Sequence, residues 1–585
     1  MGLYFNKKSR FLANLLSKTF TLKWNFLLEH FKSYEICIFD DVLIDEDLEE
    51  IAKLFLKKKK LLFIFKKSNL LFLGPVVNCP CDMCPVCVLL HLANTTKNFK
   101  FLYSKHESSY NFNYLSDLPT FQLDKKIICI NTDDKTISRF PNLFKHPFCR
   151  HDYGIKVNNH VFGSCNPGKK SLYDKNLGII RTKKSIHQIS PISLKSKLSG
   201  FEILLFWFEN PIFPLYPSLD FLELAIGTGF DYSGAYKRGL YEAVERYSSF
   251  SIPQTSSEKI CTFNELLNLN EVGINPSELW DYSKVYNKKV ALKKISNKTT
   301  LNWRKCTDPN GEFYFIPDDF LYVNMLPTSK YANLTTSGCA AHKSVEKAKV
   351  SAFLELIERD NTMRHWASSK SFPHVMNHTI PLPAQKIVHA IHNFGFETHI
   401  IDCSRFSGVF TFEVLLENKI DQRPKAIVVS GADIDPKNAL LKTLREAFGS
   451  LALVNLIENT RKSYEIEKDK IISPEEHSIF YRDPSNFYLL KPYLDQSEYI
   501  NFEKEYYQLV KSDNLYSYLL EEYSLNPYFF DLTLRFMDRD KFSVIRCTVP
   551  QLLPLTFGVG STLSKNANEE ISLTNLALNY PHPFA

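Results

Sequence analysis

The chain has 585 residues, a formal net charge of +7 and a hydrophobic content of 44%. This length exceeds what one ordinary hydrophobic core supports, so we expect at least two domains. The charge is small for so long a chain and gives only weak support to nucleic acid binding. No apolar run approaches the roughly 20 residues of a membrane span. We therefore predict neither a nucleic acid partner nor a membrane partner.

The N-terminal segment does not have the pattern of a secretion signal. Its start is basic, but Lys18 interrupts the apolar run and no small-residue cleavage site follows. We therefore predict a cytoplasmic protein with reduced thiols. The 13 cysteines are then expected to be metal ligands or buried small residues rather than disulfide partners.

The first predicted elements form an α/β unit. Glu35–Asp41 has the composition of a short strand that ends in an acidic turn, and 42–60 has helical spacing with lysines in its last turn. Two short apolar segments follow, Leu61–Phe65 and Leu71–Val77. Each is typical of a buried strand.

A cysteine cluster follows these strands and comprises Cys79, Cys81, Cys84 and Cys87. The C-x-x-C spacing of Cys84 and Cys87 is half of a tetrahedral zinc site, and Cys149 in HPFCRHDYG lies about 60 residues downstream. These three cysteines are our candidate ligands for a structural zinc ion. An iron–sulfur site is a weaker interpretation. Thiols left over from a lost metal site are nearly as well supported as zinc.

A segment rich in Gly, Asn, Pro and Lys, Phe162–Ser171, is the best candidate for a linker. It divides the chain into a first domain over 1–168 and a second over 172–585. Beyond it, strands are predicted to alternate with helices. The clearest strands are expected in FEILLFWF (201–208), KAIVVSGA (425–432) and FSVIRCTVP (542–550).

Two predicted helices carry the same arrangement of charges. Lys237–Phe250 contains Glu242 and Glu245, and Ser351–Trp366 contains Glu355 and Glu358. Residues three apart lie on one face of a helix, so two such pairs could bring four carboxylates to one point. Oxygen ligands of this kind suit Mg²⁺, which commonly also binds phosphate oxygens.

Each pair is followed by an arginine, Arg246 or Arg359. These arginines could neutralise the glutamates on an ordinary solvated helix, or they could bind a triphosphate. Spacing alone favours the ordinary salt-bridged helix. The repetition of E-x-x-E-R in two apolar surroundings shifts the balance toward a site.

The two helices and their flanks resemble the YcaO family. GTGFDYSGAYKRGLYEAVERYSSF and TTSGCAAHKSVEKAKVSAFLELIERDNTMRHW are similar to its first and second signatures. VVSGADIDPKNALLKTLREAF and FDLTLRFMDRDKFSVIRCTVPQLLPLTFG resemble two later segments. The four segments occur in the expected order between residues 172 and 585.

The resemblance implies an α/β fold that binds ATP and Mg²⁺. It assigns Glu242, Glu245, Glu355 and Glu358 to the metal and the nucleotide, and it assigns Arg246 and Arg359 to phosphate. The implied function is ATP-dependent cyclodehydration, in which the amide oxygen of a ribosomal precursor peptide is phosphorylated. Cys, Ser or Thr would become thiazoline or oxazoline, as in thiazole/oxazole-modified microcin pathways.

The chain end NYPHPFA is similar to the proline-rich tail of azoline-forming members. Pro581 and Pro583 match this pattern, and Ala585 takes the place of the last proline. We predict that these three residues reach the active site. An ordinary extended tail would also contain proline.

The cysteine-rich segment resembles the ThiF-like partner domain, related to ubiquitin-activating enzymes, that is often fused to azoline-forming proteins. We therefore expect the whole chain to be a smaller α/β domain with a possible zinc site followed by the larger ATP-binding domain. No winged-helix region for leader binding precedes it. A separate partner protein that binds the precursor's leader is consequently expected. A homodimer is also possible.

Several positions depart from the family pattern. Thr228 replaces a lysine, Arg238 stands where a serine is usual, Ser337 replaces an asparagine, and no glutamine is found near Gly449. These changes leave two further interpretations open. One is a thioamide-forming enzyme of the same family, which the Pro-x-Pro tail disfavours. The other is a catalytically degenerate subunit that binds peptide or scaffolds a synthetase complex.

Overall fold

The computed structural model describes the backbone of six N-terminal strands and most of the chain from residue 179 onward. The residues left undescribed beyond 179 are 190–197, 199, 211–221, 251–257, 283–291, 324–330, 333, 369–371, 459–465, 469–470, 496–497, 507–514, 535–541, 560–563, 566–576, 578 and 585. Within the described part, no helix combines the length and apolar character needed to cross a bilayer.

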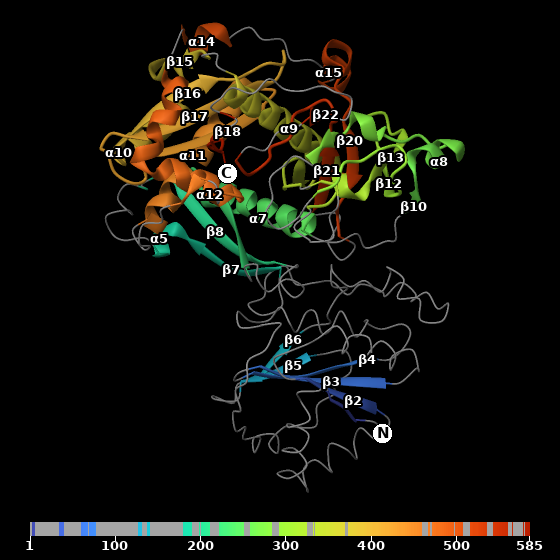
Figure 1. Ribbon diagram of the computed structural model, residues 1–585. Helices are drawn as coiled ribbons and strands as arrows, with labels where there is room; N and C mark the ends of the chain where they lie inside the picture. The colour runs from blue at the N-terminus through green and yellow to red at the C-terminus, as the bar shows by residue number, and fades with distance from the viewer. Residues whose placement is uncertain are drawn as a thin grey trace.

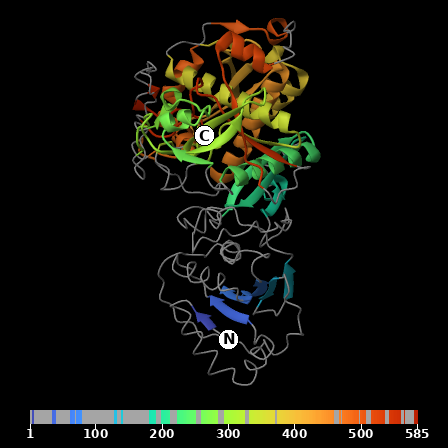
Figure 2. The same ribbon diagram turned by 90° about the vertical axis from the view of Figure 1, so that its right-hand side faces the viewer.

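The N-terminal strands form a six-stranded sheet of their own (Figures 1 and 2). Its strands are parallel from β1 to β3 and antiparallel from β3 to β6. The predicted strands at 35–41, 61–65 and 71–77 are confirmed. The six strands are β1 (Leu3–Phe5), β2 (Tyr34–Phe39), β3 (Lys60–Lys67), β4 (Leu70–Val77), β5 (Ile127–Asn131) and β6 (Ile137–Phe140).

The larger part of the chain begins with an antiparallel three-stranded sheet, β7 (Ile180–Ser185), β8 (Glu202–Glu209) and β9 (Leu222–Gly229). The central strand β8 is buried on both faces. Ile203 and Leu205 point into one core, whereas Leu204 and Phe206 point into another. This two-sided burial explains why the strand is a nearly continuous apolar run instead of an alternating one.

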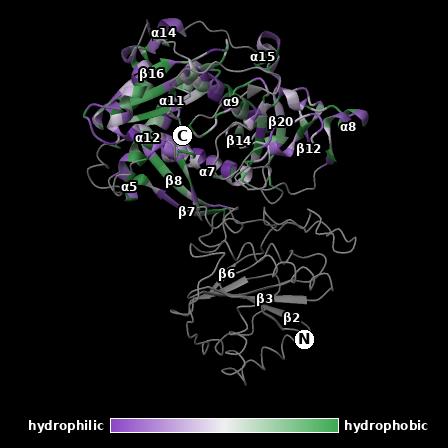
Figure 3. Ribbon diagram, in the orientation of Figure 1, coloured by the Kyte–Doolittle hydropathy of each residue, from purple (hydrophilic) through white to green (hydrophobic). Residues whose placement is uncertain are grey.

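A five-stranded sheet, ordered β18-β17-β16-β15-β19, packs on the first of these cores together with two helices. Figure 3 shows its strands as predominantly hydrophobic. The elements are β15 (His374–Val375), β16 (Phe396–Asp402), β17 (Phe410–Asn418), β18 (Ala426–Asp433), β19 (Tyr499–Ile500), α10 (Leu382–Asn393) and α11 (Pro436–Glu458).

An antiparallel sheet, ordered β10-β12-β20-β21-β14, lies on the other side of the long helix α9 (Figure 1). Strand β13 pairs with β12, and β11 pairs with β22 in a separate ribbon. Their bounds are β10 (Lys259–Cys261), β11 (Trp280–Asp281), β12 (Leu301–Thr307), β13 (Phe313–Pro317), β14 (Cys339–His342), β20 (Tyr528–Asp531), β21 (Ser543–Thr548) and β22 (Ser564–Lys565).

The remaining helices cover these sheets or connect them. Capping boxes start α8 at Thr262 and α12 at Ser473, each with a glutamate three residues later that bonds back to the cap. The helices are α5 (Ile186–Ile189), α7 (Tyr232–Ser249), α8 (Phe263–Asn268), α9 (Val345–Ala367), α12 (Pro474–Arg482), α13 (Lys491–Leu494), α14 (Phe502–Glu505) and α15 (Leu515–Tyr523).

Helix α7 lies unusually close to strands β8 and β9 because two glycines face the contact. A Cβ atom added at Gly227 would lie 1.9 Å from the carbonyl oxygen of Ala235. One added at Gly239 would lie 2.3 Å from Cε2 of Phe206. Both atoms would overlap their neighbours, so this approach requires glycine. The close packing sets the position of every side chain that α7 carries.

Substitution of Gly239 by alanine is expected to destabilise the protein by about 1–3 kcal/mol, the usual cost of overpacking. The direction of this change in stability is informative, because glycine-to-alanine substitution inside an exposed helix usually stabilises a protein by up to about 1 kcal/mol. Chemical denaturation should show the loss for Gly239→Ala and little change for Lys237→Ala, an exposed neighbour. A stabilised Gly239→Ala variant would contradict the close packing.

Candidate functional site

The two glutamate pairs come together where α7, α9 and α11 meet. Glu245 on α7 lies close enough to Glu355 on α9 for the charge of Glu355 to raise the pKa of Glu245, and the charge of Glu358 likewise raises that of Glu355. Both helices form as the spacing predicted, over Tyr232–Ser249 and Val345–Ala367. We call this meeting of carboxylates the clamp.

Glu242 is held by its own helix and by the edge of β9. One carboxylate oxygen accepts a hydrogen bond from the backbone N–H of Ile226 at 3.0 Å, and the other pairs with Arg246 at 2.8 Å. Arg246 also donates to the carbonyl oxygen of Leu224 at 3.2 Å. Glu242 is thereby fixed beside the Gly227–Gly229 end of β9.

Glu358 is almost fully buried and saturated with donors. Its oxygens accept from the hydroxyl of Ser430 at 2.8 Å and from the backbone N–H of Ala432 at 3.1 Å. Arg359 and Lys442 pair with it at 3.1 Å each. Burial opposes its ionisation, but the charges of Lys442 and Arg359 prevail and lower the pKa of Glu358 to about 2. The ionised side chain ties α9 to β18 and α11.

The pKa values of Glu245 and Glu355 are shifted in the opposite direction to that of Glu358. Burial, followed by the charge of Glu355, raises the pKa of Glu245 well above its usual range. Burial also raises the pKa of Glu355, against the lowering effect of Arg359. The backbone N–H groups of Ala341 and Gly338 bond to the two carboxylates. Two facing carboxylates repel each other, and a divalent cation between them would relieve the repulsion. These residues therefore fit Mg²⁺.

Glu446 and Lys442, one turn apart on α11, complete the clamp and were not singled out from the sequence. Glu446 is an exposed residue by its surface area, yet many protein atoms lie near its carboxylate. This desolvation, together with the charge of Glu358, raises the pKa of Glu446 to about 7. The spacing of Lys442 and Glu446 at i and i+4 in LLKTLREAF was the available signal, but it is common on ordinary helices.

The arginines predicted to bind phosphate stay charged. Burial would lower the pKa of Arg359, but the neighbouring Glu358 and Glu355 raise it. The pKa of Arg246 is likewise raised by Glu242 and Glu245 in spite of burial. Arg359 reaches Glu355 at 3.4 Å and Ser430 at 3.3 Å, so it bridges α9 and β18. The clamp thus contains fixed positive charge beside its carboxylates.

A second positive region lies at the end of β9. The guanidinium of Arg238 donates to the carbonyl oxygen of Thr228 at 2.5 Å, so its charge stands beside the Gly-Thr-Gly end of β9. Arg445 on α11 is close enough that Arg238 contributes to lowering its pKa to about 10, after loss of hydration as the larger cause. Two arginines that repel each other in this way would be stabilised by an anion between them.

Two departures from the family pattern are neighbours in space. A Cβ atom at Gly449 would lie 2.5 Å from Cγ2 of Thr228. The absence of a side chain at Gly449 on α11 therefore leaves room for the Thr228 side chain at the end of β9. A long side chain at position 449 would displace Thr228, so the two changes are compatible with each other.

The loop before β14 places backbone donors against α9. Gly338 has a φ of +81°, and a Cβ atom there would lie 2.8 Å from Cδ2 of Leu356. Both constraints require glycine. Ser337, where the family pattern has asparagine, accepts a hydrogen bond from the hydroxyl of Thr335 at 3.0 Å. The loop keeps its shape with serine at this position.

Asp360, adjacent to the clamp in sequence, has a different role. It is buried and pairs with Arg364 at 2.8 Å and with Arg405. It also accepts from the backbone N–H of Leu553 at 2.8 Å. Its charge is thus used to anchor α9 to the chain after β21.

The C-terminal residues Pro581–Phe584 are buried against α12. Tyr481 donates to the carbonyl oxygen of Pro581 at 2.5 Å, and His477 Nδ1 lies 2.9 Å from the carbonyl oxygen of His582. Burial lowers the pKa of His582 well below its usual range, and Arg359 contributes to this shift. The described tail therefore extends to within electrostatic range of the clamp. Ala585 lies outside the described residues.

The model of the YcaO family, described as a YcaO cyclodehydratase that binds ATP and Mg²⁺, matches residues 226–553. The chain belongs to the YcaO family. This matched range contains both signature helices and all the clamp residues. A comparison with curated protein sequences finds no match.

The solved structures that are similar to this chain include two heterocyclases. One is a heterocyclase in complex with substrate and cofactor, with a TM-score of 0.61, 17% identity, and coverage of 89% of this chain and 76% of that one. The other is the heterocyclase TruD, with a TM-score of 0.54, 16% identity, and coverage of 89% and 74%. At these identities the likeness establishes the fold. The predicted α/β fold class is confirmed.

The zinc ligands predicted from the sequence, Cys84, Cys87 and Cys149, lie outside the described residues. The proposed linker at 162–171 lies outside them as well, so the ThiF-like domain remains a prediction. Two other cysteines, Cys339 and Cys547, stand in apolar stretches of the sequence that are typical of a core. Each is 1% exposed in the structure.

The clamp predicts a characteristic dependence of stability on pH. The pKa of Glu446 is about 7 in the folded chain and about 4.3 in the unfolded chain. Between these values the folded state binds more protons, so the stability of the Mg²⁺-free protein should fall as the pH rises. Added Mg²⁺ should stabilise the protein more at pH 8 than at pH 6, because it binds ionised carboxylates.

Thermal unfolding of Glu446→Gln should show a flatter pH profile and a smaller effect of Mg²⁺. The control is Glu346→Gln on α9, whose side chain is 70% exposed. Equal pH profiles for the wild-type protein and Glu446→Gln would contradict the raised pKa.

Proposed function

We propose that this chain is an ATP-dependent cyclodehydratase that converts Cys, Ser or Thr of a ribosomally made peptide into thiazoline or oxazoline. The observation that supports it most directly is the clamp. Carboxylates from α7, α9 and α11 surround a site that also holds Arg246, Arg359 and Lys442. Hard anionic ligands with fixed cations nearby are what a magnesium–triphosphate complex requires.

The proposed reaction uses ATP to remove an amide oxygen. The side chain of Cys, Ser or Thr adds to the preceding carbonyl carbon, and the resulting oxygen attacks the γ-phosphorus atom, which releases ADP. The oxygen then leaves as phosphate, and the ring nitrogen forms a double bond to the former carbonyl carbon. Overall the peptide loses one water, and ATP becomes ADP and phosphate. The protein's contribution is positioning and charge neutralisation.

Each part of the clamp has a proposed role in this reaction. Glu245 and Glu355 are the best candidates for Mg²⁺ ligands, because their mutual repulsion is relieved by a cation. When bound, Mg²⁺ would neutralise charge that develops on the phosphates. Glu358 is already bonded to four donors, and we assign it to holding Arg359 and Lys442 in place.

The partner of the reaction is proposed to be a ribosomal precursor peptide, with a separate protein that binds its leader. The C-terminal tail is proposed to contribute to the same site through Pro581 and Pro583, since His582 between them is within electrostatic range of Arg359. The mass of the product distinguishes the two reaction types. Cyclodehydration removes one water, whereas thioamide formation exchanges oxygen for sulfur.

The main alternative is a subunit that has lost catalysis and binds peptide or scaffolds a complex. The changes at Thr228, Arg238 and Ser337 favour it. Their geometry weakens this alternative, because the Arg238 guanidinium stands at the end of β9, where the family pattern has a lysine. We propose that Arg238, together with Arg445, supplies the phosphate charge that Thr228 lacks.

Calorimetry with ATP should give Mg²⁺-dependent binding to the intact chain. Glu355→Gln should weaken this binding at least about tenfold, equivalent to roughly 1.4 kcal/mol, because it removes a proposed metal ligand. Glu346→Gln on the same helix should bind ATP as the wild-type chain does. An intact chain that binds no ATP, even with a precursor peptide and leader-binding protein added, would reject the enzyme and favour the scaffold.

Arg238→Ala tests the replacement of the family's lysine. We expect ATP affinity to fall about tenfold, in the range of one charge-assisted hydrogen bond to phosphate. Lys237→Ala, which changes an adjacent exposed charge, should leave the affinity unchanged. Equal affinities for both variants would show that Arg238 does not bind the nucleotide.

A further inference from the structure

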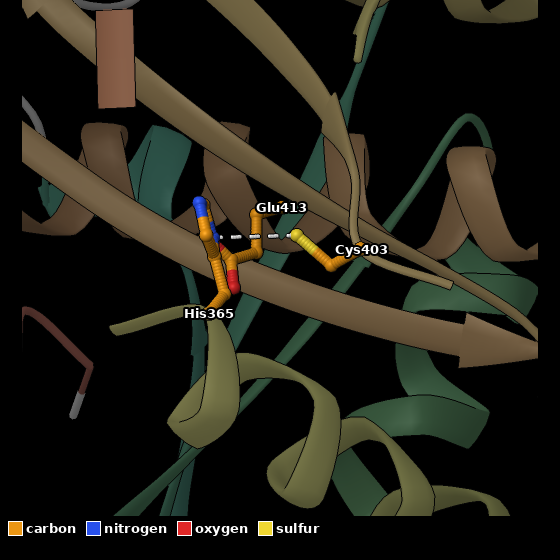
Figure 4. A group of neighbouring side chains, drawn as sticks. All are labelled: His365, Cys403 and Glu413. Carbon is orange, nitrogen blue, oxygen red and sulfur yellow. Dashed lines mark hydrogen bonds and ion pairs between the residues drawn. The ribbon is translucent and has the colours of Figure 1, made fainter. Parts of the chain in front are cut away.

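A separate group of metal-binding side chains lies in the core, further along α9 from the clamp. His365 is near the end of α9, Cys403 directly follows β16, and Glu413 is on β17. Figure 4 shows the three side chains directed toward one another. Their potential ligand atoms all lie within 4.8 Å of each other, and the residues are at most 4% exposed.

The hydrogen bonds inside this group are incomplete. His365 Nδ1 lies 2.8 Å from a carboxylate oxygen of Glu413 and 3.4 Å from the sulfur of Cys403. The single nitrogen Nδ1 of His365 thus lies close to both the carboxylate of Glu413 and the sulfur of Cys403. The second oxygen of Glu413 is buried and has no hydrogen-bond partner, and the same holds for the hydroxyl of Tyr493. The Tyr493 ring lies 4.4 Å from the His365 ring. Each such buried polar atom destabilises the folded chain unless a partner satisfies it.

We propose that His365, Cys403 and Glu413 bind a divalent cation of the zinc class. The thiolate and the carboxylate would supply two negative charges, and neutral imidazole would supply none, so the bound group would be neutral in the core. Binding forms a sulfur–metal bond and releases the Cys403 proton to solvent, without any change of oxidation state. The second oxygen of Glu413 is available as a fourth ligand atom.

The distances are close to those of such a site. Zn–N and Zn–O bonds of about 2.0–2.1 Å and a Zn–S bond of about 2.3 Å, at tetrahedral angles, separate nitrogen from sulfur by roughly 3.6 Å and nitrogen from oxygen by roughly 3.3 Å. The observed nitrogen–sulfur distance is 3.4 Å. The nitrogen–oxygen distance of 2.8 Å would increase by about half an ångström. A small rotation of the Glu413 side chain supplies this.

The ligand types distinguish this group from the clamp. Sulfur and nitrogen ligands select zinc over magnesium, which prefers oxygen ligands. The proposed role is structural. His365 is seven residues beyond Glu358, about 10 Å along the helix axis. A cation here would join the end of α9 to β16 and β17, and it would hold the helix that carries Glu355 and Arg359.

Two other states of the group are possible outcomes. A buried water could satisfy Glu413 and Tyr493, or the three side chains could form a dry hydrogen-bond network. Neither releases a proton, and neither gives a metal signal. Metal content therefore separates them from the proposed cation without any reference to ATP or to peptide modification.

The experiment is metal analysis of the full-length chain, purified under reducing conditions and supplied with Zn²⁺. Because the N-terminal cysteines are also candidate zinc ligands, it is done in the wild-type chain and in Cys84→Ser/Cys87→Ser. Cys403→Ser should remove about one zinc per chain in both backgrounds. Cys306→Ser, at a buried cysteine that bonds only a backbone carbonyl in the described structure, should remove none.

A second measurement detects the sulfur–metal bond directly. Co²⁺ substituted into Cys84→Ser/Cys87→Ser should give a sulfur-to-cobalt charge-transfer band that Glu413→Gln weakens and Cys403→Ser abolishes. Removal of metal by a chelator should lower the melting temperature, with recovery on adding Zn²⁺ but not Mg²⁺. Zinc content unaffected by Cys403→Ser, or no cobalt band in that background, would overturn the proposal.

Discussion

The architecture of the site depends on one buried charge. Glu358 is 2% exposed, and an isolated carboxylate at that depth would be strongly disfavoured. It is tolerated because donors from α9, β18 and α11 converge on it. The same bonds that stabilise Glu358 fix the relative positions of three elements. Loss of one donor would therefore shift a helix and would also leave the Glu358 carboxylate incompletely neutralised.

Around this anchor, the carboxylates are divided into two kinds by their surroundings. Glu358 is held ionised by two cations, whereas Glu245 and Glu446 have raised pKa values because of crowding and mutual repulsion. Without a bound cation, the repulsion between carboxylates destabilises the folded chain. A cation that binds between them removes this repulsion, so the repulsion strengthens cation binding.

Much of this arrangement could be predicted from the sequence. The i, i+3 spacing of Glu242 with Glu245 and of Glu355 with Glu358 indicates one face of a helix, and a buried helix face carrying two carboxylates requires partners. The strand at 201–208 was clear from its apolar run. These features depend on local periodicity, which a sequence displays directly.

The parts that escaped prediction depend on contacts between distant segments. Lys442 and Glu446 look like an ordinary helical pair until α11 is packed against α9. The position of the Arg238 charge beside Thr228 follows from the close approach of α7 to β9, which two glycines permit. His365, Cys403 and Glu413 are far apart in sequence and have no common motif, so only the fold brings them together.

The way in which the tail is held has a consequence for how its sequence can vary. Tyr481 and His477 contact the carbonyl oxygens of Pro581 and His582, and the His582 ring lies 2.7 Å from the carbonyl oxygen of Thr556. Helix α12 thus binds the main chain of the tail and also packs the His477 ring 4.2 Å from the His582 ring. Proline fits this arrangement because it retains its carbonyl and lacks the N–H that would need a partner. A residue that replaced His582 would have to fill a buried space beside Thr556 and His477, so this position is constrained as well as the prolines that flank it.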